Sequence, residues 1–196
     1  MNPALALIEF DSIAVGIEAG DAMVKRAPLG LIQSGTVQPG KYIVLIAGDV
    51  ASVEESLTAG ADLGGEAIVD TVFLPDIHPD VVAAMQGTRN YGNGEALGVI
   101  ETRTVAAVIE AADAAVKGAT VTTAQIEMAD GLGGKGYVLL GGILSEVEAA
   151  VSAGVAALTD SQLIASVVIP QLHEEMRDDV VASAWFRERV QKGERA

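Results

Sequence analysis

Cysteine is absent from the 196-residue sequence, so disulfide bonds and thiolate-held zinc or iron–sulfur sites are excluded. Basic residues are scarce as well, with 12 Lys and Arg against 27 Asp and Glu and a formal net charge of −15. Nucleic-acid binding needs clustered Lys and Arg that displace counterions from phosphates. Docking on an anionic membrane surface needs the same kind of charge. We therefore expect neither nucleic acid nor a membrane as a partner.

Long apolar runs and aromatic side chains are also lacking. No run approaches the ~20 residues of a membrane-spanning helix. Residues 1–9 show no basic segment before a long hydrophobic one, so we expect no secretory signal. Phe, Trp and Tyr make up 4% of the chain, which leaves a core of small side chains. The absence of cysteine fits a reducing cytoplasm. The length allows one large domain or two of roughly 90 residues each.

What the sequence does contain is an internal duplication. Residues 4–27 agree with residues 96–119 at about half of their positions, far above chance. Residues 86–94, between the copies, are polar and rich in Gly and Asn, as in a linker. Further repeated residues, first copy before second, are Gly40-Lys41 and Gly134-Lys135, Pro75 and Pro170, and His78 and His173. We predict a first domain over residues 1–86, a linker over 87–94, a second domain over 95–181 and a tail helix over 182–196.

Both copies predict the same order of elements. Short apolar runs predict buried strands, and apolar residues three and four apart predict amphipathic helices after the first and third strands. The predicted strands are 4–9, 29–32, 42–47 and 67–74 in the first copy and 96–101, 121–128, 137–140 and 163–169 in the second. A short helix, 79–85 or 174–181, ends each copy. The order β-α-β-β-α-β indicates the α+β class, as two tandem ferredoxin-like domains.

The sequence also predicts which faces of the helices are apolar and which residues cap their N-termini. The first helix has an apolar stripe, and the second copy repeats it with identical spacing. In the helix after the third strand, Asp49 is the expected N-cap. Val50, Val53 and Leu57 form the expected buried side of that helix. In the second copy Ser145 and Glu148 have capping-box spacing. The two stripes consist of Ile13, Ile17, Gly20, Val24 and Ala27, and of Val105, Ile109, Ala112, Val116 and Ala119.

Candidate catalytic groups are few. His78 and His173 occupy the same place in both copies, whereas an active site needs unlike groups that converge on one point. Their repetition favours packing or an interface hydrogen bond. Lys25 and Lys117 follow Asp21 and Asp113 by four residues, a favourable helix pair, or they project at a subunit edge. The glycines before Lys135 lack the spacing and the Ser or Thr of a phosphate-binding loop. We expect a protein without catalytic residues.

The motifs together resemble the bacterial microcompartment shell domain, present twice as in the tandem shell proteins of trimeric type. The resemblance covers about nine-tenths of the chain and is strongest to the propanediol-utilisation members. It is carried by the segments Ala4–Glu9, Ala22–Ala27, Gly40-Lys41, Gly48–Val50, Ala59-Gly60 and Asp76–Pro79, and by their order in both copies.

This resemblance implies a homotrimer with six-fold pseudosymmetry. Such discs tile edge to edge with other shell proteins, around encapsulated enzymes, in the bacterial cytoplasm. The loops between the middle strands then line a central pore, and the helix lysines lie at the disc edge. The implied pore-lining residues are Gly35, Thr36, Val37, Gln38, Pro39, Gly40, Asp130, Gly131, Leu132, Gly133 and Gly134. The implied edge residues are Lys25, Arg26, Lys117, His78 and His173.

Gln38 departs from the pattern of the most similar family members. In the propanediol-type relative a cysteine precedes the Pro-Gly-Lys of the first copy, and three such thiolates hold an iron–sulfur cluster. Glutamine cannot replace a thiolate, so we expect neither a cofactor nor a metal. Three Gln38 amides would instead form a polar constriction with donors and acceptors. We expect a pore that passes small polar metabolites.

Two other classes of function remain as alternatives. Ferredoxin-like repeats often bind small ligands between subunits, so a metabolite-sensing regulatory protein is one. An enzyme that uses the paired histidines His78 and His173 is the other.

Overall fold

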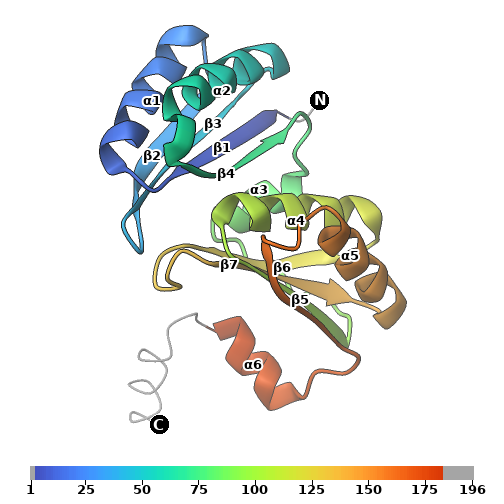
Figure 1. Cartoon of the computed structure of the whole chain (residues 1–196). Coiled ribbons are helices and arrows are strands. Elements are labelled where there is room, and N and C mark those ends of the chain that lie inside the picture. Colours follow the sequence, from blue (N-terminus) through green and yellow to red (C-terminus); the bar gives the residue numbers. More distant parts are fainter. Residues whose placement is uncertain (1–2, 183–196) are drawn as a thin grey trace.

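The chain folds into two similar halves, each an antiparallel four-stranded sheet with two helices on one face (Figure 1). The computed structural model describes residues 3–182; the predicted tail helix over 182–196 falls almost entirely outside them. The elements of the first half are β1 (Ala4–Phe10), α1 (Ile13–Arg26), β2 (Leu31–Val37), β3 (Lys41–Gly48), α2 (Val50–Gly64), a 3₁₀ turn (Gly65–Ala67), β4 (Ile68–Leu74) and α3 (Pro79–Met85). Its sheet order is β2-β3-β1-β4, which is that of a ferredoxin-like fold.

The second half repeats the arrangement with the sheet order β6-β7-β5-β8. Its elements are β5 (Ala96–Thr102), α4 (Val105–Gly118), β6 (Thr122–Met128), β7 (Gly136–Gly142), α5 (Leu144–Ala156), β8 (Leu163–Ile169) and α6 (Glu174–Ala182). The predicted α+β class and the two tandem ferredoxin-like domains are therefore confirmed. Within residues 3–182 no helix is long and apolar enough to cross a membrane.

The two halves share a core. All seven residues of β1 are buried, although a strand in a one-sided sheet alternates buried and exposed residues. Ala6 and Ile8 point into the core beneath α1 and α2, whereas Leu5 and Leu7 join a cluster with Ile109 and other residues of α4. Helix α4 thus covers the face of the first sheet that its own helices leave free (Figure 1).

Helix α3 crosses from the first half to the second. It contacts β6 and α4, and its Val81 and Ala84 lie in the shared core. The following residues run beside β6, where Asn90 N–H donates to the Ala124 carbonyl at 3.2 Å. The predicted linker therefore forms part of the junction between the halves.

Several local predictions are confirmed and others are wrong. Asp49 caps α2, because its carboxylate accepts from Ser52 N–H at 3.0 Å. Val53 is buried as expected, but Leu57 is half-buried and Val50 is 42% exposed. The capping box in α5 is wrong: the N-cap is Ile143, which supplies no side-chain hydrogen bond, and Ser145 lies inside the helix.

Candidate functional site: the hairpin loops and the assembly surfaces

The first predicted pore loop is a tight hairpin between β2 and β3. Strand pairing continues to Val37 opposite Lys41. Gly35, Thr36 and Val37 therefore lie within β2, although the sequence pattern had placed them in the loop. The loop proper is Gln38–Gly40. Gly40 has a φ of +102°, which residues with a side chain rarely adopt.

The second predicted pore loop joins β6 to β7. Ala129 N–H donates to the Lys135 carbonyl at 2.8 Å, which closes the hairpin one step beyond the strands. Residues 130–134 form the turn, and Gly131, Gly133 and Gly134 all have positive φ. The glycines are required by the backbone here rather than by a bound phosphate.

The two loops lie against each other. A Cβ atom at Gly134 would stand 2.9 Å from the Gln38 carbonyl oxygen and 3.0 Å from Pro39 Cδ. The ends of the two hairpins project side by side in Figure 1. A hollow of about 280 Å³ beside them is lined from both halves, by Gly35 and Asp130 among others. The structure thus brings all eleven predicted pore residues into two adjacent hairpins, and their lining of a pore stays a prediction.

Each hairpin is anchored by a Lys–Glu pair. Lys41 Nζ lies 3.2 Å from Glu9 Oε2, and Lys135 Nζ lies 3.0 Å from Glu101 Oε1. Glu9 is fully buried, and its Oε1 accepts from Ala106 N–H at the start of α4 at 2.8 Å. Burial raises the pKa of Glu9 above 4.5, while the bonds to Ala106 and Lys41 oppose that rise. Sequence reasoning missed these pairs, although their recurrence at equal places in both copies was a visible signal.

The predicted edge residues lie at the other end of the sheets, where Leu5 pairs with Leu74. Two of them cross the junction between the halves. Lys117 Nζ donates to Asp113 at 2.6 Å and to the Asp76 carbonyl at 2.5 Å. His78 N–H donates to the other Asp113 oxygen at 2.8 Å, and its ring Nδ1 caps α3 by accepting from Asp80 N–H. The edge role of both residues stays a prediction.

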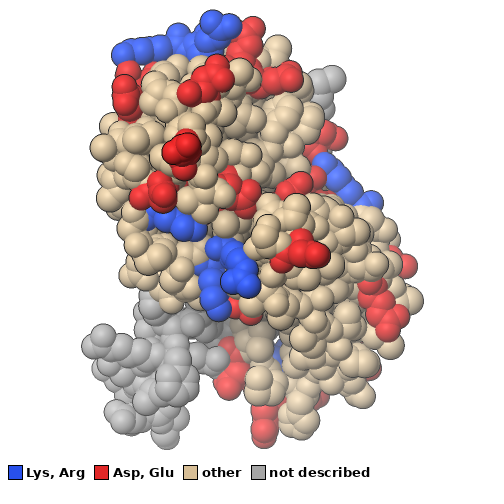
Figure 2. Space-filling view, viewed as in Figure 1, with Lys and Arg blue, Asp and Glu red and all other residues tan. Residues whose placement is uncertain are grey.

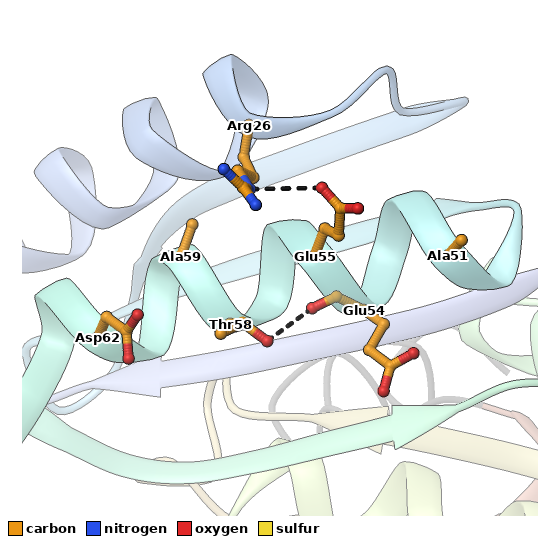
Figure 3. A pocket seen from close by; sticks show the side chains of 7 residues that line it. All are labelled: Arg26, Ala51, Glu54, Glu55, Thr58, Ala59 and Asp62. Atoms are coloured by element: carbon orange, nitrogen blue, oxygen red, sulfur yellow. Dashed lines mark hydrogen bonds and ion pairs between the residues drawn. The ribbon is translucent and has the colours of Figure 1, made fainter.

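The remaining edge residues are open to solvent. Lys25 pairs with Asp21 at 2.5 Å, with side chains 73% and 57% exposed. Figure 3 shows Arg26 reaching from α1 to Glu55 on α2, at 3.4 Å, over a groove of about 540 Å³. His173 is exposed, and its carbonyl accepts from Arg177 N–H. The edge role of these three residues is a prediction as well.

Within residues 3–182 no cluster of metal-binding side chains accompanies these features. In the described part of the chain no three or more His, Asp or Glu residues gather as a metal site. The groove in Figure 3 holds carboxylates and Arg26 but neither histidine.

The duplicated surfaces differ sharply in exposure. On α4 the stripe residues Val105 and Ile109 are 3% and 0% exposed, because they pack on the first sheet. The matching residues of α1, Ile13 and Ile17, are 40% and 54% exposed. The free face of the second sheet shows a contrast on its β8 side, where Val167 is 50% exposed and its counterpart Val72 is 4% exposed. Met176 of α6 is 52% exposed, whereas its counterpart Val81 of α3 is 0% exposed. Leu97 and Leu139, on the same face of the second sheet, are buried in a cluster with Leu172.

Comparison with known proteins gives the family. The sequence profile of the BMC domain matches residues 4–77 and again residues 96–172. The chain belongs to the BMC domain family. The two matched segments cover β1 to β4 and β5 to β8, and they end before α3 and α6.

Shell and carboxysome proteins are among the relatives of the chain. The chain is 42% identical over 177 residues to the bacterial microcompartment shell protein PduT of Citrobacter freundii, over 90% of this chain and 96% of that protein. It is 30% identical over 190 residues to the carboxysome assembly protein CcmO of Synechococcus elongatus, over 90% of this chain and 68% of that protein. A microcompartment protein from Desulfitobacterium hafniense has a similar crystal structure, with a TM-score of 0.77, 42% identity, and coverage of 90% of this chain and 99% of that one.

Proposed function

We propose that this BMC domain protein is a structural shell component that assembles as a homotrimeric ring around a central pore. The observation that carries the proposal is the contrast between covered and open duplicated surfaces. Helix α4 covers the free face of the first sheet, whereas the matching stripe residues Ile13 and Ile17 of α1 and the β8 side of the matching sheet face, at Val167, stay open. A contact between unlike surfaces generates a ring when its rotation closes. Six similar domains at ~60° close after three chains.

Polar contacts of the junction support the same closure. Asp113 accepts from His78 N–H, and the duplication places Asp21 and His173 at the matching positions of the open surfaces. Lys117 reaches the Asp76 carbonyl, and Lys25 would reach the matching carbonyl of Gln171 in a neighbouring copy. Asp21 and Lys25 are paired and solvent-exposed in the single chain, so both are available for such contacts.

Ring closure would gather the hairpins on the axis. Gln38–Gly40 and residues 130–134 lie at one end of their sheets, opposite the end that carries Lys25 and Lys117. Six loops would then surround a pore that passes small polar metabolites, with the lysines at the disc rim. Such discs would tile with other shell proteins around encapsulated enzymes, in a microcompartment of the bacterial cytoplasm.

The alternatives have less support. The relatives reported above are shell and carboxysome proteins, which favours a structural role over a metabolite sensor. The two histidines do not form a catalytic pair in the described chain, since His78 Nδ1 caps α3 and His173 is exposed near α6. We therefore infer a protein that is not an enzyme.

The mass of the assembly tests the proposal. Light scattering of the purified protein should give three chains of 20.0 kDa each, and electron microscopy of concentrated samples should show sheets or tubes. A monomer or an open-ended series of masses would contradict ring closure. A ligand-dependent thermal shift without any sheets would favour the sensor.

A further inference from the structure

We infer that Asp130 makes the pore rim acidic, so that the pore admits cations and neutral polar solutes in preference to anions. This inference deepens the proposed pore and rests on it. It changes the expectation of an uncharged constriction built from Gln38 alone.

Asp130 and Gln38 hold equivalent positions in the two hairpins. The last paired residues of the first hairpin are Val37 and Lys41, and Gln38 comes next. In the second hairpin Ala129 N–H bonds the Lys135 carbonyl, and Asp130 comes next. The second loop is longer by two residues, and the extra length lies beyond Asp130. If Gln38 lines the axis, Asp130 lines it too, and a ring of three chains alternates amide and carboxylate.

The charge of Asp130 has no counterion within residues 3–182. Asp130 is exposed, and its carboxylate has no hydrogen-bond or ion-pair partner within residues 3–182. Lys41 and Lys135, which flank the loops in the sequence, are held by Glu9 and Glu101. Arg89 is paired with Glu127 at 3.0 Å, and Arg103 lines a separate hollow together with Lys41 and Asp70.

Basic side chains beside the hairpins would oppose an acidic rim unless they are paired. Figure 2 shows basic side chains at the junction between the halves and at the top of the view, among scattered acidic ones. Two of the lysines at that end of the sheets pair with glutamates, so their charge is cancelled locally. Rings of Asp or Glu side chains are a recurring device for cation selectivity in pores. A net charge of −15 for each chain adds to the barrier against anions.

Ion selectivity in a planar bilayer tests the inference. The assembled protein would be reconstituted between unequal KCl solutions, and the reversal potential would give the permeability ratio of K⁺ to Cl⁻. We expect a ratio of about five at low salt, falling toward one as salt screens the carboxylates. The variant Asp130→Asn should bring the ratio close to one at low salt. Gln38→Asp should raise it above that of the unmodified protein.

Asp62→Asn is the matched control. It makes the same change of charge on the exposed face of α2, in the groove of Figure 3, and should leave the ratio unchanged. A ratio of one or less in the unmodified protein overturns the inference, and so does a ratio that Asp130→Asn does not alter. A trimer that conducts no ions overturns the pore itself, an outcome distinct from a pore of the wrong selectivity.

Discussion

Glu9 shows how a single side chain ties the two halves together. Its carboxylate is fully buried, one oxygen accepts from the first turn of α4, and the other meets Lys41 behind the first hairpin. Negative charge at a helix N-terminus is favourable, but removing a carboxylate from water is costly. Desolvation is the larger effect, and it raises the pKa of Glu9 above 4.5.

This raised pKa predicts a pH dependence of stability. The folded state holds the Glu9 proton more tightly than the unfolded state does. Protonation of Glu9 therefore stabilises the fold below pH 4.5, and this stabilisation is lost as the pH rises through the pKa of Glu9 in the folded state. We expect the free energy of unfolding of Glu9→Gln, relative to the unmodified protein, to increase between about pH 4 and 7. Urea unfolding at several pH values measures this difference. A difference that stays constant or decreases over that range would refute the account.

At the scale of elements, the equivalent helices α1 and α4 differ in what covers their apolar stripes. Helices α1 and α4 share an apolar stripe, but only α4 has a sheet beneath that face within the chain. In α1 Gly20 of the stripe is buried with Gly16, Ala19 and Met23 on the side that packs on the first sheet, whereas Ile13, Ile17 and Val24 are exposed. These three residues form an exposed apolar surface, which we propose is covered by another chain.

A matched pair of substitutions separates the two roles. Ile109→Asp places a carboxylate in the fully buried core and should unfold the chain, at a cost of about 4 kcal/mol or more. Ile17→Asp changes a residue that is 54% exposed and should leave the circular-dichroism spectrum and the fold intact. The Ile17→Asp protein should sediment as a monomer. If Ile17→Asp remained a trimer, the stripe of α1 would not be the closing surface.

These elements also show which features could be predicted from the sequence and which could not. Local pattern predicted the limits of α3 (Pro79–Met85) and β8 (Leu163–Ile169) as the structure has them, because proline and apolar runs act locally. It placed Gly35–Val37 in a loop, since their strand conformation comes from pairing with β3. Exposure of a stripe depends on which neighbour covers it, so the identical spacing in α1 and α4 gave no sign of their difference. The Glu9–Lys41 contact joins residues far apart in sequence, and only the fold brings them together.

At the scale of the whole molecule, one chain contains one junction between its halves and, in the proposed ring, would supply the two surfaces of a second. The junction within the chain joins His78 N–H to Asp113 at 2.8 Å. The matching residues, Asp21 on α1 and His173 before α6, lie on the two open surfaces of the same chain. A ring would bring Asp21 of each chain to His173 of the next.

The absence of cysteine makes this geometry testable by cross-linking. His78→Cys with Asp113→Cys should be joined by a short bismaleimide within one chain, so a denaturing gel should show a monomer of altered mobility. Asp21→Cys with His173→Cys should be joined between chains in dilute solution. If the ring closes after three chains, as we propose, the covalent products should end at the trimer. Each single substitution should remain a monomer on the gel. A ladder that continues beyond the trimer would mean that the contact repeats without closing, and the pore, which needs a closed ring, would be lost with it.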